Sequence, residues 1–355
     1  MKLLVSINFN RIMNEQTLRP LINSDRVTRI YVVHDIDVPQ MPKLERYNTP
    51  KWLYSPGHRL TLRGVIRTLW HFLLVFFIAI IKKPDAIVGF YIFPHALYAF
   101  ICGKILRKPA IACIVDWPGI WHLKRRLIPM LKHCDVITTT GTKTQEFLLK
   151  QGVNKKKLFI LPDSIDIERF KPLFLPKNYD IIFMGRIAPA KNVDTLLRVI
   201  AKVKKSKSNL TVGIVGDGPL MDSMKTLAAQ LGITDNVEFL GFRNDPEQYY
   251  NSAKIFVLTS YYEGLPMAML EAMACGIPCV VPDVGDITDA AINGVNAMVI
   301  DDPYDVNGFA DAIISLLNNA ELYKKLSENT KMVREKYWYE SATKAWNGIL
   351  DSLKG

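Results

Sequence analysis

Two series of short apolar runs, separated by stretches of helical length, constrain the fold of this 355-residue chain more than any other feature. The first series is rich in Val and Ile and comprises KLLVSIN, RIYVVHD, DAIVGFY, PAIACIVD, CDVITTT and KLFILPD. The second comprises YDIIFMG, TVGIVGDG, NVEFLGF, AKIFVLTS, PCVVPD and NAMVID. Such alternation predicts an α/β protein with two doubly wound, Rossmann-like domains in series.

The segment KPLFLPKNYD, which starts at Lys171, contains two prolines and little periodicity. We interpret it as the interdomain linker, so the domains are expected at 1–172 and 173–337. The first residues, MKLLVSINFN, are expected to form a strand, because the apolar run is too short for a signal peptide.

The five cysteines form no even framework and lie in apolar stretches, which indicates a reduced, cytoplasmic compartment. Cys275 and Cys279 have no second ligand pair nearby, so a zinc site is not expected.

Charge is distributed unevenly along the chain. Residues 1–176 contain 27 Lys and Arg against 12 Asp and Glu, a net +15, and residues 177–355 contain 18 against 22, a net −4. The first half is therefore expected to meet an anionic surface. Nucleic acid is disfavoured as that surface, because no β-motif with interleaved aromatic and basic residues is present.

A helix is expected from Arg59 to Lys83, and Arg59, Arg63 and Arg67 recur at every fourth residue, on one helical face. The apolar run LWHFLLVFFIAII within it has thirteen residues, fewer than the roughly 20 that a bilayer crossing needs. One interpretation is a helix buried against the sheet. The other is a basic helix on anionic headgroups, with Trp70 at the interface and the cluster Lys124, Arg125 and Arg126 extending the surface. Both interpretations can apply to one helix, with its arginine end on lipid and its apolar end in the core.

In the second half, Gly185 and Arg186 end a strand, and Lys191 precedes a helix that starts near Asn192. Ligands of open α/β sheets bind at the carboxyl ends of the strands, where two cations beside a helix N-terminus suit a diphosphate. The turn with Gly216 and Gly218 indicates a sharp strand-to-helix connection and lacks the third glycine of a dinucleotide fingerprint.

The segment EGLPMAMLE gives the strongest signal. Gly264 and Pro266 lie where a loop becomes a helix, so Glu263 is expected on the loop and Glu271 about two turns into the helix. One carboxylate can accept hydrogen bonds from sugar hydroxyls and the other from ribose hydroxyls, with a diphosphate over the helix start.

Together these motifs, with the following Cys-Gly-Ile-Pro, resemble the family 4 retaining glycosyltransferases of GT-B fold, the group 1 glycosyl transferases. The resemblance implies two Rossmann-like domains facing a central cleft, with the last helix, at 338–353, crossing back so that 338–355 joins the first domain. It implies that Arg186 and Lys191 hold the donor diphosphate, Glu271 the ribose and Glu263 the transferred sugar. The remaining donor-site residues that it implies are Gly185, Gly216, Gly218, Arg243, Gly264, Leu265 and Pro266.

The first half departs from that family. Asn8-Phe9-Asn10-Arg11 replaces a glycine-rich loop, and Val115 stands where members often have His, which leaves Asp116 as the catalytic candidate there. His95 is either an alternative polar group at a strand end or a structural histidine. Asp35 and Asp37 form an Asp-x-Asp triplet, at which we do not expect a metal.

The resemblance implies a retaining glycosyltransferase that uses a UDP- or GDP-sugar and needs no metal or other cofactor. We expect a lipid-linked glycan acceptor at the cytoplasmic face of the membrane, peripheral membrane contact, and a role in surface polysaccharide synthesis. Two alternatives stay open: a sugar-nucleotide epimerase, and an inactive, membrane-associated subunit that binds nucleotide sugars.

Overall fold

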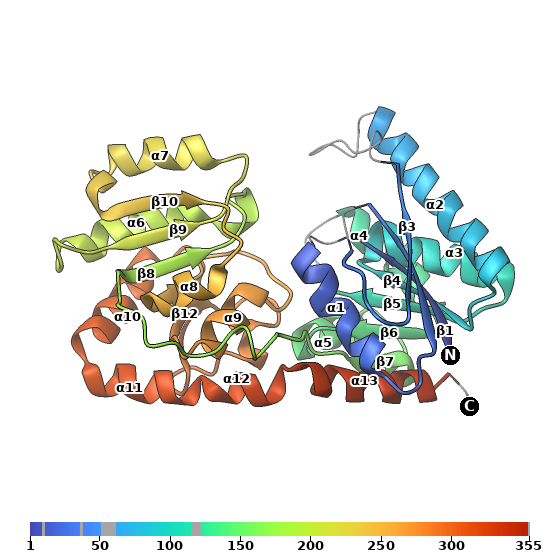
Figure 1. Cartoon of the computed structure of the whole chain (residues 1–355). Coiled ribbons are helices and arrows are strands. Elements are labelled where there is room, and N and C mark those ends of the chain that lie inside the picture. Colours follow the sequence, from blue (N-terminus) through green and yellow to red (C-terminus); the bar gives the residue numbers. More distant parts are fainter. Residues whose placement is uncertain (9–10, 36–37, 51–61, 116–121, 354–355) are drawn as a thin grey trace. The chain divides into compact units, whose positions relative to one another are not determined.

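A computed structural model describes residues 1–8, 11–35, 38–50, 62–115 and 122–353 (Figure 1). The chain divides into two compact units: Met1–Ser164 with Tyr339–Gly355, called here the first unit, and Ile165–Trp338, called the second unit. The boundary expected after residue 172 falls inside the second unit, because Ile165 and Phe170 are fully buried in its core.

The first unit contains a parallel sheet in the order β3-β2-β1-β4-β5-β6-β7 among the described residues. Val5 of β1 pairs with Val32 and Val88, so the central strands are built from β-branched residues. Edge strand β3 was not expected from the sequence, because polar residues dominate it and none of its residues is buried. The strands are β1 Lys2–Ile7, β2 Arg29–His34, β3 Leu44–Asn48, β4 Ala86–Phe90, β5 Ala110–Ile114, β6 Val136–Thr139 and β7 Leu158–Ile160.

Helices cover both faces of this sheet (Figure 1). Leu3 and Val5 pack in one core with Trp346 of the last helix, whereas Leu4 packs in another with Val75. Because side chains alternate along a strand, Ser6 faces the same side as Leu4. The helices are α1 Arg11–Asn23, α2 Leu62–Lys82, α3 Leu97–Leu106, α4 His122–Leu131, α5 Thr142–Lys150 and α13 Tyr339–Asp351. The prediction that the last helix joins the first domain is confirmed.

The second unit contains a parallel sheet in the order β10-β9-β8-β11-β12-β13. Strand order reverses between β8 and β11, and ligands of doubly wound sheets bind at such a point. The strands are β8 Tyr179–Met184, β9 Val212–Val215, β10 Val237–Gly241, β11 Ala253–Val257, β12 Cys279–Pro282 and β13 Ala297–Ile300. The helices are α6 Val193–Lys204, α7 Met221–Gln230, α8 Pro246–Asn251, α9 Met267–Ala274, α10 Val306–Asn318, α11 Ala320–Asn329 and α12 Lys331–Lys336.

Helix α2 is longer than its thirteen-residue apolar run indicates. It has 21 residues and, within the described part of the chain, is the one helix long and apolar enough to cross a membrane by length and composition. Only 28% of its most apolar window is buried. Val75, Ile78 and Ala79 nevertheless pack into the core of the first unit, so one face of α2 belongs to the domain and the other is exposed.

Candidate functional site

The segment that carries Lys191 is tied to the loop after β11 by Asn192. Asn192 has a left-handed backbone (φ 51°), which asparagine tolerates better than most residues. Its buried side chain donates hydrogen bonds to the carbonyls of Thr259 at 2.9 Å and Pro303 at 3.0 Å. The Thr259 hydroxyl donates back to the Asn192 carbonyl at 2.9 Å. The sequence predicted a helix start near Asn192, but it did not predict that the Asn192 side chain connects this segment to the loop after β11.

This tie brings two predicted site residues together. The ammonium nitrogen of Lys191 lies 2.5 Å from Oε1 of Glu263. Their side chains are 24% and 12% exposed, so the pair is shielded from water more than a surface ion pair and still open to a ligand.

Glu271 lies in α9, as predicted, and is buried. The Tyr250 hydroxyl donates a hydrogen bond to Oε2 of Glu271 at 3.0 Å. Burial, reinforced by the adjacent carboxylate, raises the pKa of Tyr250 well above its usual value, so this hydroxyl keeps its proton. Tyr250, on α8, was missed because nothing in its sequence neighbourhood marks it as a partner of Glu271.

Two glycines let the turn after β9 lie directly against the loop after β8. Gly216 has φ 135°, and a Cβ there would overlap the carbonyl oxygen of Gly185. A Cβ on Gly218 would overlap the carbonyl of Ile187. The Gly185 amide donates to the Val215 carbonyl at 3.0 Å. The two glycine motifs therefore form one surface at the strand ends.

A third glycine, which was not singled out from the sequence, supports the loop before α9. Gly285 has φ 54°, and a Cβ there would overlap the Glu263 carbonyl oxygen. The Asp286 amide donates to the Gly264 carbonyl at 2.9 Å. Gly264, Leu265 and Pro266 are buried, so this predicted stretch fixes the entry into α9.

The remaining predicted donor residues lie at the surface. Arg186 is exposed, and within the described residues its guanidinium makes no hydrogen bond or ion pair. Arg243 is exposed too, with its guanidinium 5.7 Å from the centre of the Tyr249 ring. Both cations are open to a charged or aromatic ligand.

The residues predicted in the first half are not all described. Asp116 and Arg59 lie outside the described residues, as do the side chains of Lys124 and Arg125. Arg63, Trp70 and Arg126 are exposed, as expected of surface contacts.

Arg67 corrects the expectation of a shared arginine surface. Its side chain is only 13% exposed, and its Nε lies 3.7 Å from Oδ2 of Asp35. The carboxylate holds Arg67 on the inner side of α2, so it does not lie on an exposed face with Arg63.

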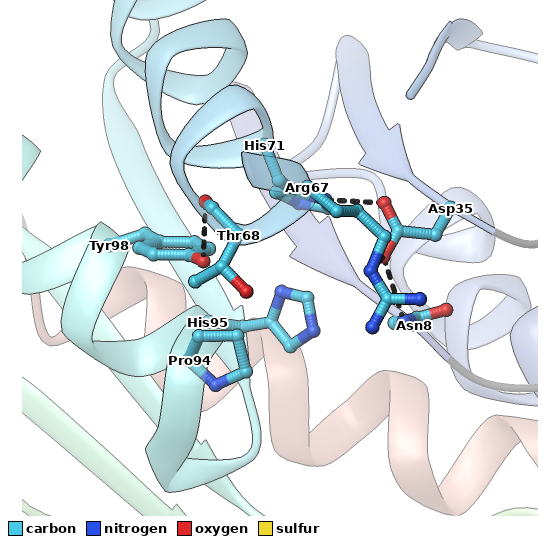
Figure 2. Close-up of a pocket in the computed structure, with 8 residues that line it drawn as sticks. All are labelled: Asn8, Asp35, Arg67, Thr68, His71, Pro94, His95 and Tyr98. Atoms are coloured by element: carbon cyan, nitrogen blue, oxygen red, sulfur yellow. Dashed lines mark hydrogen bonds and ion pairs between the residues drawn. The ribbon is translucent and has the colours of Figure 1, made fainter. Parts of the chain in front are cut away.

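A buried polar cluster lies beside Arg67 in the first unit (Figure 2). This cluster was not predicted from the sequence. His71 lies 2.9 Å from Asp35, and Ser6 lies 3.0 Å from His71 and 2.8 Å from His95. Burial acts to raise the pKa of Asp35, but the hydrogen bond and positive charge of His71 outweigh it and lower this pKa to about 2.

Potential metal ligands were compared across the described part of the chain. It contains no group of three or more His, Cys, Asp or Glu side chains that could hold a metal ion, and Asp37 lies outside it. The cysteines, including Cys275 and Cys279, are free thiols and buried.

The second unit is similar to proteins of known family. Residues 164–333 match the family model described as glycosyl transferases group 1. An uncharacterized glycosyltransferase of Haemophilus influenzae is 29% identical over 221 residues, 61% of each chain. A D-inositol 3-phosphate glycosyltransferase of Mycolicibacterium smegmatis is 30% identical over 196 residues, 52% of this chain and 45% of the relative. The chain thus spans less than two thirds of the length of these curated relatives.

Solved structures resemble the whole chain in fold. HepE of Anabaena, solved in complex with UDP-glucose, has a TM-score of 0.81 at 17% identity, over 100% of this chain and 99% of HepE. At that identity the likeness shows the fold alone, and it confirms the expected GT-B class.

Proposed function

We propose that this chain, whose residues 164–333 form a group 1 glycosyl transferase domain, is a retaining glycosyltransferase that uses a nucleotide-diphosphate sugar. One observation carries the proposal: the Lys191–Glu263 pair at 2.5 Å, beside the start of α9 and at the carboxyl ends of the strands. A cation suits a diphosphate there, and a carboxylate suits the hydroxyls of the attached sugar.

The reaction in this proposal breaks the bond between the anomeric carbon and the β-phosphate. An acceptor oxygen bonds to that carbon on the same face, and the departing phosphate oxygen takes the acceptor proton. Charge grows on the phosphate as the bond breaks, and Lys191, Arg186 and the first amides of α9 are the groups that stabilise it. These cations can supply the neutralisation that a metal supplies elsewhere, so the proposal includes no metal.

Glu271 and Arg243 complete the proposed donor site. The Tyr250 hydroxyl donates to Oε2 of Glu271, and we assign the Glu271 carboxylate to the ribose hydroxyls and Arg243 to the base. A uridine or guanosine diphosphate donor is proposed. HepE, which shares the fold, was solved with UDP-glucose, and this favours uridine.

The acceptor is proposed to be lipid-linked, at the cytoplasmic face of a membrane. Support comes from the outer side of α2, where large apolar side chains at helical spacing are exposed in one row. We call this row the apolar face of α2: Leu62, Val65, Ile66, Leu69, Trp70, Leu73, Phe77, Ile80 and Ile81. So wide an apolar surface, in a half of the chain with net charge +15, suits anionic lipid headgroups and peripheral binding.

The test is transfer of label from radioactive nucleotide sugars to membrane lipid. The proposal expects label in the organic phase only when purified protein, donor and a bacterial membrane extract are combined. A sugar-nucleotide epimerase would convert the sugar of the free donor without membranes. An inactive binding subunit would bind donor and leave all label in the water phase. Either result would overturn the proposal.

A further inference from the structure

Two stacked tyrosines lie beside the proposed donor site in the second unit. Tyr261 follows β11 and Tyr304 follows β13, and their ring centres lie 5.8 Å apart with an angle of 20° between the ring planes. Tyr261 comes two residues before Glu263 in the sequence. Tyr304 is 60% exposed although it stacks on Tyr261, so the two rings present an aromatic surface to solvent. We call Tyr261 and Tyr304 the tyrosine pair.

Backbone hydrogen bonds fix the two loops that carry the tyrosine pair. The Tyr261 amide donates to the Ala190 carbonyl at 3.2 Å, which joins this residue to the loop after β8. The Asn192 side chain donates to the Pro303 carbonyl at 3.0 Å and so holds the residue before Tyr304. A surface that is fixed in advance loses little conformational freedom when a ligand binds to it.

Carboxylates flank the tyrosine pair. Asp194, in the first turn of α6, is exposed and makes no hydrogen bond or ion pair with any residue that the structure describes. Burial raises the pKa of Tyr261, and the neighbouring Tyr304 and the charge of Asp194 raise it further. Oδ1 of the exposed Asp302 accepts from the Tyr304 amide at 2.9 Å. Because like charges repel, these carboxylates disfavour phosphate-bearing ligands such as nucleic acid and anionic lipid.

A sugar ring matches this combination of side chains. The C–H groups on one face of a sugar ring pack against an aromatic ring, and its hydroxyls point outward from the edge. A carboxylate accepts hydrogen bonds from such hydroxyls, and Asp194 and Asp302 provide carboxylates beside the rings. An organic ammonium ion is the other class of ligand that binds aromatic rings beside carboxylates. A sugar is favoured here, because the adjacent Glu263 is already assigned to a sugar.

We propose that the tyrosine pair binds a sugar ring of the acceptor glycan, separately from the donor sugar at Glu263. The inference rests on the proposed function, which supplies a glycan as the acceptor. It also narrows the class of acceptor. A lipid that carries a single sugar cannot both present the reacting hydroxyl and stack a second ring on Tyr304, so the acceptor glycan contains more than one sugar.

The first test is saturation-transfer nuclear magnetic resonance of the full chain. The probes are maltotetraose and chitotetraose, with choline as the cationic probe. We expect saturation of at least one tetrasaccharide by the wild type, loss of that signal in Tyr304→Ala, and its retention in Tyr304→Phe, which keeps the ring. Phe174→Ala removes a fully exposed aromatic ring elsewhere in the second unit and is the matched control. Saturation of neither tetrasaccharide, of choline alone, or equally in Tyr304→Ala would overturn the sugar site.

The second test separates glycan binding from donor binding. Tyr304→Ala is expected to raise the KM for the lipid-linked acceptor of the membrane extract about tenfold, the cost of losing one stacked ring, while the Kd for UDP or GDP stays at the wild-type value. Tyr304→Phe should restore most of the loss. An unchanged acceptor KM in Tyr304→Ala would overturn this inference and leave the proposed function standing. Absence of transfer by the wild-type protein would remove the proposed function, while the tetrasaccharide experiment still reports on the tyrosine pair.

Discussion

The two units share a doubly wound parallel architecture, yet they build their polar sites differently. In the second unit, all proposed site residues except Arg243 come from three short segments, 185–191, 216–218 and 263–271, which follow neighbouring strands. In the first unit, Ser6, Asp35, His71 and His95 come from four separate elements. A site made of contiguous motifs can be predicted from a sequence. A site made of single, distant residues can be recognised only once the fold is known.

We expect the largest effect from disturbing the close backbone contact between the turn after β9 and the loop after β8, a contact of the second unit. Gly216→Ala should lower the free energy of unfolding of the second unit by roughly 3 kcal/mol or more, because the new Cβ overlaps the Gly185 carbonyl and the φ of 135° disfavours a side chain. Gly232→Ala is the matched control: its φ is 65°, but no atom lies within 4 Å of the new Cβ. Thermal denaturation with donor absent measures both. Equal costs in the two variants would show that the close approach of the two loops is not needed.

The second largest effect is expected from removing a positive charge at the proposed donor site. Lys191→Ala should lower turnover about a hundredfold, because it removes a cation from the departing phosphate. The exposed Lys225 on α7 gives the control, and Lys225→Ala should keep wild-type turnover. Wild-type turnover in Lys191→Ala would refute the diphosphate role of this residue.

The strands and the donor-site motifs of the second unit could be predicted from the sequence. The strands of both units were predicted, apart from β3, because apolar Val- and Ile-rich runs have few other uses in a soluble domain. Lys191 and Glu263 were predicted as residues of one donor site because each lies next to a helix start, but their ion pair was not predicted. Asn192 and Tyr250 were not, since their roles depend on carbonyls and carboxylates that only the fold brings near.

The same reasoning explains the polar cluster of the first unit. His71 lies within the apolar run LWHFLLVFFIAII and was assigned no role from the sequence, and Asp35 was considered only as part of the Asp-x-Asp triplet. The alternation of β1 directs Ser6 toward α2, and the parallel sheet sets the ends of β2 and β4 beside it. Both facts follow from strand register and order, which local sequence does not determine.

A smaller effect is expected in acid, where the first unit should lose the stability that Asp35 contributes. The pKa of Asp35 is lowered from 3.8 to about 2, so its contribution is fully present above pH 4 and is lost as the pH falls toward 2. That contribution is about 2 kcal/mol. Asp35→Asn should therefore be less stable than wild type at pH 7 by this amount, with the difference vanishing near pH 2. Asp311→Asn, at an exposed position on α10, serves as control. A difference that persists unchanged to pH 2 would contradict the ionised Asp35–His71 pair.

The smallest effect is expected for membrane binding, which should depend on the first unit alone. Replacing Leu69 and Phe77 together by Glu should weaken binding to vesicles that contain anionic phospholipid about tenfold, because two exposed apolar side chains leave the apolar face of α2. Ile292→Glu changes an apolar side chain in the second unit that is 41% exposed, and it should have little effect. Co-sedimentation measures both. Equal loss in the two variants would remove α2 as the membrane contact.

The proposed donor site requires that the second unit bind the diphosphate of a nucleotide at Lys191. Titration calorimetry of the full chain with UDP and with GDP tests it without any acceptor or membrane. We expect saturable binding of at least one of the two nucleotides, weakened about tenfold or more in Lys191→Ala and unchanged in Lys225→Ala. Absence of binding by the wild-type chain, or the same affinity in Lys191→Ala, would contradict it.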